Sequence, residues 1–267
     1  THWGSVRQAL REQKLSGQAG GLKLPRCIAA LMLDHPAAGT MQLGKHLTDP
    51  MTVVAYKIGS TDQPATGSWS RLISFRQPLE RYFGKLLAML VAFFADLMIP
   101  RVSKPGMAVK ILAGEFDARF DGLWEQARNE YQAITRRDRA TLNWRYRQHP
   151  DTAYQVLTVE DQGELRGYLV YSVFFRHQQR RAHIVDILAS HRDTAVLEAL
   201  IAEALHQFRR QSVHRVECYA GGKTVISALE HLGFKPRLHK GKVQSTLVRG
   251  IPPLEELYVT RGDGDGG

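Results

Sequence analysis

The chain has 267 residues, of which 43% are hydrophobic and 23% charged, as in ordinary globular proteins. This length suits one large domain or two small ones, and no stretch is long and apolar enough to span a membrane. The formal net charge of +10 favours an anionic partner, such as a nucleotide cofactor, a phosphorylated substrate or a lipid surface. Because the basic residues form scattered pairs, no specific nucleic-acid site is predicted.

The cysteine and histidine residues narrow the class of protein further. Two cysteines, Cys27 and Cys218, provide no disulfide framework, and both are predicted to be reduced in a cytoplasmic protein. The start of the chain does not resemble a cleaved signal. The histidines are scattered without metal-ligand spacing, so no bound metal is predicted.

The first 106 residues are the least regular. Residues 1–58 suggest a partial N-terminal α/β region of unassigned fold, and residues 59–106 a linker that contains an apolar helix over 86–99. One interpretation of this helix is a buried element that packs two halves of the protein together. The other is a helix with basic flanks that lies on a membrane surface or mediates homo-oligomer formation.

From Met107 onward the pattern becomes regular. A helix through Phe120 and Ala127 follows a first strand, and Asp138 can cap a second helix that ends before His149. Two antiparallel strands joined by a polar turn at 161–164 come next. The expected strands cover residues 107–112, 154–160 and 165–176.

Residues 181–234 contain the most regular pattern of all, strand, helix, strand, helix. His183–Ala189 is an apolar run interrupted by Asp186, and Val213–Tyr219 is a second strand. Asp193 or Thr194 can cap the intervening helix, which predicts a right-handed parallel crossover. Residues 242–248 and 257–260 are predicted as closing strands, and 261–267 as a flexible tail.

This order of elements over 107–260 resembles the GNAT superfamily of N-acyltransferases. The resemblance is carried by LNWRYRQHPDTAYQVLTVEDQGELRGYLVYS, with its Trp-Arg-Tyr segment before a hairpin, and by ALEHLGFKP. The Trp-Arg-Tyr-x-x-His-Pro motif of the first segment and the sequence YVTRGDGDGG most resemble tandem GNAT-like proteins of bacterial envelope and exopolysaccharide gene sets. The resemblance implies an α/β (α+β) fold with a GNAT-like mixed central sheet flanked by helices.

The resemblance also implies an activity, in which an acyl group moves from acetyl-CoA or another acyl-CoA to an amine of a sugar, amino acid or envelope precursor. The acyl-CoA would lie where two parallel strands part near Ile187, with Leu188 beside it, and backbone N–H groups would polarise the thioester carbonyl. Its pyrophosphate would lie at the start of the next helix. The residues expected there are Ser190, His191, Arg192 and Thr194.

Two departures from the family pattern favour an alternative function. The loop from Ala189 to Ala195 lacks the glycines that let the backbone approach a pyrophosphate, and Asp193 adds a negative charge. Leu229 stands where many members have a tyrosine proton donor. The alternative is therefore a non-catalytic GNAT-fold module that binds a partner or a membrane surface.

Asp186 is the candidate catalytic proton acceptor, because it interrupts an apolar strand at the presumed site. The other interpretation is a structural carboxylate paired with an arginine such as Arg145 or Arg166. Strand alternation predicts that His183 does not meet Asp186. Arg145, Tyr168 and Tyr171 are the candidate substrate-binding residues, the two tyrosines on opposite faces of one strand. Trp144 and Tyr146 are predicted to be packing residues, with substrate stacking as the alternative.

Overall fold

A computed structural model describes the chain over the ranges that close this sentence: 42–44, 60–63, 66–74, 91, 94, 107–150, 152–190, 193–239, 242–243, 246–249 and 257–263. The chain divides into two compact units, residues 1–64 with 245–253, and residues 65–244 with 254–267. In the first unit, β13 (Thr246–Arg249) pairs antiparallel with both β1 (Gln42–Gly44) and β2 (Ser60–Gln63).

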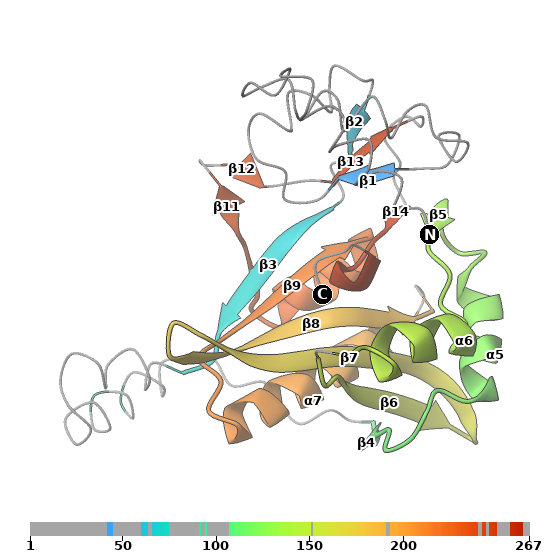
Figure 1. Cartoon of the computed structure of the whole chain (residues 1–267), viewed down its shortest axis with the longest axis horizontal. Coiled ribbons are helices and arrows are strands. Elements are labelled where there is room, and N and C mark those ends of the chain that lie inside the picture. The colour runs from blue at the N-terminus through green and yellow to red at the C-terminus, as the bar shows by residue number, and fades with distance from the viewer. Residues whose placement is uncertain are drawn as a thin grey trace, which may run out of the picture. The chain divides into compact units, whose positions relative to one another are not determined.

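The second unit is built on a seven-stranded sheet in the order β10-β3-β9-β8-β7-β6-β4 (Figure 1). Every neighbouring pair in this sheet is antiparallel except β8 and β9, which are parallel. The mixed sheet with flanking helices confirms the predicted α+β fold class. Its strands are β3 (Thr66–Leu72), β4 (Val109–Ile111), β6 (Gln155–Asp161), β7 (Glu164–Arg176), β8 (Gln179–Ala189), β9 (Arg215–Gly221) and β10 (Lys235–Pro236).

Aspartates begin three of the helices, and two of them, Asp138 and Asp193, were cap candidates in the sequence. Asp117, Asp138 and Asp193 each accept a hydrogen bond from a backbone N–H of the first turn, which satisfies donors that the helix itself leaves unpaired. Gly233 follows the last helix with a φ of 77°, a conformation that glycine adopts without strain. The helices are α5 (Ala118–Ala127), α6 (Arg139–Leu142), the π-helical turn η1 (Asn143–Arg147), α7 (Thr194–Arg210) and α8 (Lys223–His231).

The helices cover both faces of the sheet (Figure 1). On one face, Tyr168 of β7 packs against Phe116 and Phe120 at the start of α5. On the other face, Tyr171 meets Phe208 of α7 edge to face, with ring centroids 5.0 Å apart. The two tyrosines therefore point to opposite faces, as strand alternation predicts. None of the described helices combines the length and apolar character needed to cross a bilayer.

Three expectations for the ends of this unit are corrected. Thr66–Leu72 lies in the predicted linker but forms β3, which pairs with β9 and β10. Residues 242–248 do not close the sheet, because β13 belongs to the first unit. The predicted tail is ordered over Arg261–Asp263, which forms the short 3-10 turn η2.

Two other predictions fall largely outside the described residues. Of the apolar segment 86–99, only Val91 and Phe94 are described, both in helical conformation, so its function stays a prediction. Of residues 1–58, only β1 is described. The predicted partial α/β fold of that region also stays a prediction.

Candidate functional site

The two parallel strands part where the sequence predicts. β8 and β9 are paired from Arg181 with Arg215 up to Ile184 with Cys218. β8 then continues to Ala189 and β9 to Gly221 without further pairing between them. We call the space between residues 185–189 and 219–221 the strand gap.

A β-bulge accounts for the parting. On the β7 side of β8, Val170 faces Asp186 and Tyr171 faces Ile184, so Val185 is an extra residue without a partner. An extra residue bends its strand and increases the local twist. The bulge thus lies immediately after the last β8–β9 pair, where β8 must turn away.

The strand gap is filled by the chain's own C-terminal segment. The Gly221 N–H donates to the Val259 carbonyl at 2.6 Å, and Ala220 forms an antiparallel bridge with Thr260. On the other side of the gap, the Tyr258 hydroxyl donates to the Ile187 carbonyl. β14 (Leu257–Tyr258) also pairs with β5 (Ala133–Ile134), which fixes the segment from a third direction.

A buried charge network holds this segment in place. The Arg137 guanidinium, with no exposed surface, donates from Nε to Asp186 Oδ1 at 3.1 Å and from Nη2 to Asp263 Oδ2 at 2.6 Å. Burial by itself lowers the pKa of Arg137, but Asp186 and Asp263 raise it more, so its pKa stands well above the ordinary value. Asp263 also accepts from the Thr260 N–H at 2.8 Å.

Asp186, the predicted proton acceptor, is enclosed by this network. Its side chain has no exposed surface, and its oxygens accept hydrogen bonds from Arg137, from the Thr260 hydroxyl at 3.0 Å and from the Tyr168 hydroxyl at 3.0 Å. The arginine that pairs with it is therefore Arg137. The two arginines considered from sequence pair with other carboxylates, Arg145 with Asp263 and Arg166 with Asp193. The catalytic role of Asp186 stays a prediction.

The start of α7, where a pyrophosphate was expected, holds a carboxylate of the chain itself. Asp193 accepts from the Val196 N–H and pairs with Arg166 at 3.2 Å. A carboxylate there already uses the N–H groups and the positive end of the helix dipole.

The residues expected to contact the cofactor differ in their burial and in their hydrogen-bond partners. Ile187 and Leu188 are buried in β8, the Ser190 hydroxyl donates to Glu130 Oε1 at 2.8 Å, and Thr194 is exposed at the start of α7. His191 and Arg192 lie outside the described residues. The cofactor role of this whole set stays a prediction.

Tyr168, Tyr171 and His183 line neither of the described pockets. Both tyrosines are core residues, and His183 lies on the other side of the bulge from Asp186, against Phe174 and Glu217. Burial first, and then the nearby arginines with Arg261 foremost, together lower the pKa of His183 to about 3. It is therefore neutral at pH 7, despite Glu217 Oε2 at 3.9 Å.

The Cys218 thiol keeps its proton at pH 7 and is therefore neutral. Burial raises the pKa of its thiol to about 12. A thiol in this environment is a poor nucleophile.

A pocket of about 350 Å³ opens beside the bulge. Its walls come from η1, the segment that follows η1, the bulge residue Val185 and the η2 turn. Of the predicted substrate-binding residues, only Arg145 lines it. The lining residues are Trp144, Arg145, Tyr146, Gln148, His149, Pro150, Tyr154, Val185, Gly262 and Asp263.

The sequence assigned two of these residues to packing. Tyr146 is 3% exposed, which confirms that prediction, but Trp144 is 66% exposed, so the prediction was wrong for Trp144. His149 was considered only as a helix terminator. The π-helical hydrogen bonding of η1 widens the turn at Asn143–Arg147, and the sequence pattern gives no signal for it.

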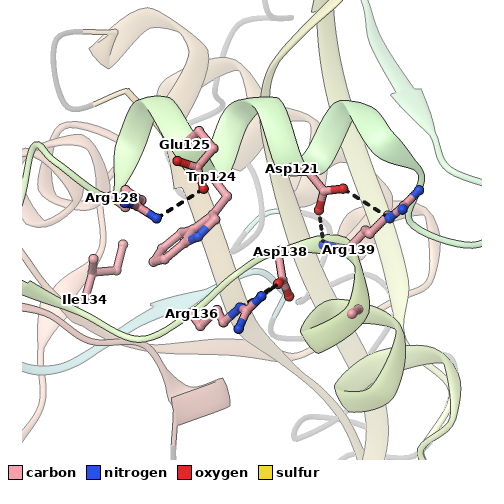
Figure 2. A pocket seen from close by; sticks show the side chains of 9 residues that line it. Asp121, Trp124, Glu125, Arg128, Ile134, Arg136, Asp138 and Arg139 are labelled. Atoms are coloured by element: carbon pink, nitrogen blue, oxygen red, sulfur yellow. Dashed lines mark hydrogen bonds and ion pairs between the residues drawn. The ribbon is translucent and has the colours of Figure 1, made fainter.

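A second pocket, of about 630 Å³, lies between α5 and the chain that enters α6 (Figure 2). Figure 2 shows that its charged side chains pair with one another, Asp121 with Arg139, Glu125 with Arg128 and Asp138 with Arg136. Because these charges are already compensated, this pocket does not require a ligand. Among the residues that the structure describes, no group of three or more His, Cys, Asp or Glu side chains is arranged to hold a metal ion.

No protein-family model matches the sequence. No curated protein matches it either. Among solved structures, N-myristoyltransferase of Saccharomyces cerevisiae matches with a TM-score of 0.52 and 9% identity, over 78% of this chain and 51% of the enzyme. A GCN5-related N-acetyltransferase from Anabaena variabilis has a TM-score of 0.49 and 11% identity, over 85% and 48%.

A probable N-acyltransferase from Enterococcus faecalis has a TM-score of 0.49 and 12% identity, over 85% and 48%. The chain thus spans about half the length of these proteins. At such low identity the likeness to the myristoyltransferase shows the fold, which is the GNAT fold that the sequence predicts.

Proposed function

We propose that the chain works as an acyl-CoA-dependent N-acyltransferase, with an amine of a sugar, amino acid or bacterial envelope precursor as the acceptor. One observation carries the proposal: β8 and β9 part after Ile184, and the pocket opens at Val185, the same point. An enzyme that transfers an acyl group from a thioester to an amine needs two adjoining sites, one for each reactant. The acceptor occupies the pocket, where Arg145 is a wall residue.

As folded, the strand gap does not fit a bound acyl-CoA. Leu257–Thr260 occupies it, and Asp193 caps the helix at which the pyrophosphate was expected. The proposal therefore requires the C-terminal segment to withdraw from Ile187 and Gly221 before the cofactor enters.

Two side chains are candidates for taking the amine proton. His149 lines the acceptor pocket, whereas Asp186 lies behind it with its oxygens engaged by Arg137 and Tyr168. A proton acceptor must reach the proton directly or through one water. His149 meets this condition as folded, and Asp186 meets it only after the charge network opens.

Calorimetric titration of the full chain with acetyl-CoA tests the proposal. The Tyr258→Phe variant removes the hydroxyl that holds the segment to Ile187, so we expect it to bind acetyl-CoA several-fold more tightly than the unmodified chain. Phe175→Ala, an exposed substitution on the β7–β8 hairpin, is the matched control and should change nothing. Absence of heat and of a thermal shift for both proteins at millimolar acetyl-CoA would overturn the proposal.

The filled strand gap favours a second candidate, a non-catalytic GNAT-fold module that binds a partner or a membrane surface. In this case the C-terminal segment is a permanent part of the core, and acetyl-CoA binds neither the chain nor Tyr258→Phe. Size measurement and liposome flotation of the full chain then test the partner. A monomer that stays unbound at every lipid composition would count against this candidate.

A further inference from the structure

The pocket beside the bulge has the dimensions of a small-molecule site. Its volume of about 350 Å³ lies at the lower end of the range for ligand pockets. Aromatic side chains from Trp144, Tyr146, His149 and Tyr154 contribute to its wall. Such a wall suits a flat ring, because aromatic faces and edges pack well against one another.

The exposed charge on the wall is positive. Asp263 has no exposed side-chain surface and accepts hydrogen bonds from Arg137 and the Thr260 N–H, whereas the Arg145 side chain is 21% exposed. Arg145 donates from Nη1 to Asp263 Oδ1 at 3.2 Å, and a guanidinium has further N–H donors on its other edges. A ligand in the pocket therefore meets a cation and not the buried carboxylate.

A buried hydroxyl adjoins the pocket and belongs to one of its lining residues, Tyr146. The Tyr146 side chain is 97% buried, and its hydroxyl has no hydrogen-bond partner within the part of the chain that the structure describes. The hydroxyl lies against Gly262, where a Cβ atom would collide with it. Buried hydroxyls in proteins are nearly always paired, so this one has hydrogen-bonding capacity to offer a ligand. Because the oxygen has less than 1 Å² of accessible surface, a ligand atom pairs with it only when the wall at Gly262 shifts.

Trp144 supplies an apolar surface that solvent reaches. It is 66% exposed and lines the pocket. An exposed tryptophan next to an arginine provides a stacking surface beside an anion-binding group. Asp263 partly neutralises Arg145, which favours a singly charged carboxylate over a doubly charged phosphate.

We propose that this pocket binds a carboxylate-bearing aromatic amine, with the carboxylate on Arg145 and the ring against Trp144. As a binding site it stands alone, and only its role as the acceptor site rests on the proposed transferase function. The proposal narrows the acceptor to amines of the aromatic amino acid or aminobenzoate type. The Tyr146 hydroxyl pairs with a polar atom at the inner end of the ligand.

The test uses 4-aminobenzoate and aniline as probes, each titrated into the full chain without acyl-CoA and followed by ligand-observed NMR. We expect 4-aminobenzoate to bind at least about tenfold more tightly than aniline, because only the former has the carboxylate. Arg145→Gln should bring the two affinities together. Trp144→Ala should weaken both probes by a similar factor.

Two exposed positions provide matched controls. Phe175 is 68% exposed on the β7–β8 hairpin, and Arg128 pairs with Glu125 on α5, away from this pocket. Phe175→Ala and Arg128→Gln should leave both affinities unchanged. Thermal melting establishes that each variant is folded, and if Arg145→Gln is not, the two probes and Trp144→Ala decide alone.

The outcomes separate this proposal from the transferase function. Equal binding of the two probes by the unmodified chain, no binding of either, or full discrimination retained in Arg145→Gln would overturn it, whatever acetyl-CoA does. Discrimination that depends on Arg145 and Trp144 supports it even if acetyl-CoA does not bind. In that case the site belongs to a binding module and the transferase function fails.

Discussion

The strand gap and the pocket meet at Val185 and have opposite contents. The gap is filled by main chain from Leu257–Thr260 and fixed by charges without exposed surface. The pocket is lined by an exposed tryptophan, a partly exposed arginine and a tyrosine whose hydroxyl has no partner among the residues that the structure describes. The difference shows that two adjoining regions of one sheet can differ, because the chain itself fills the gap while the pocket stays open.

Removing the charge network beside the strand gap should have the largest effect on stability. Arg137→Met leaves Asp186 and Asp263 buried without their common cation, so we expect a loss of roughly 3–5 kcal/mol in the free energy of unfolding. Urea denaturation measures this value. Arg128→Met, which breaks an exposed pair, should cost less than about 1 kcal/mol. Equal effects of the two substitutions would mean that the network does not hold the segment.

Asp263→Asn should loosen the C-terminal segment while Arg137 keeps one carboxylate partner. Loss of charge-assisted hydrogen bonds predicts a cost of roughly 2–3 kcal/mol. Because the Gly221 N–H donates to Val259, its hydrogen exchange should become faster in the variant. Unchanged exchange at Gly221 would show that η2 does not control the gap.

His183 gives a pH-dependent test of the same segment. Its folded-state pKa of about 3 lies below the ordinary value of about 6.5. The unfolded chain therefore binds a proton that the folded chain does not, and stability falls as pH decreases from about 6.5 toward 3. Between pH 6.5 and 5 the decrease should amount to at most about 2 kcal/mol.

The charged groups near His183 link it to the C-terminal segment. They are Glu217, Arg176, Arg181, Arg237 and, from η2, Arg261. His183→Gln should flatten the pH dependence, which urea midpoints at pH 6.5 and 5 measure directly. An equally steep profile in this variant would assign the dependence to other groups.

Local signals in the sequence predicted the central part of the fold. Asp117, Asp138 and Asp193 begin helices because a cap acts within four residues, and strand alternation placed Tyr168 and Tyr171 on opposite faces. Thr66–Leu72 was missed because its sequence, TGSWSRL, has little apolar alternation, and it forms a strand through pairing with β9.

The candidate site was harder to predict than the fold. Arg145 was identified as a substrate-binding candidate, and it lines the pocket. Residues 257–260 were predicted as a strand, but the ordered turn at Arg261–Asp263 was missed, because Arg137 and Asp263 are 126 residues apart in the chain. A local pattern carries no information about a pair so distant, and the small residues around Asp263 are typical of a flexible end.

The smallest expected effect comes from comparing a buried tyrosine of each region, Tyr258 in the gap and Tyr146 beside the pocket. The Tyr258 hydroxyl donates to the Ile187 carbonyl in the gap, whereas the Tyr146 hydroxyl has no partner among the described residues. Tyr258→Phe should therefore cost about 1 kcal/mol, because it removes a hydrogen bond and leaves a buried carbonyl unpaired. Tyr146→Phe removes a hydroxyl that has no partner within the described part of the chain, so stability should stay the same or rise slightly.

Urea denaturation of the two variants without ligand measures the contrast. Adding 4-aminobenzoate should then stabilise the unmodified chain more than Tyr146→Phe, because only the former offers the hydroxyl to the ligand. A loss of stability in Tyr146→Phe equal to that in Tyr258→Phe would mean that the Tyr146 hydroxyl is paired within the protein. The pocket would then be satisfied internally, like the gap, and the distinction between the two regions would disappear.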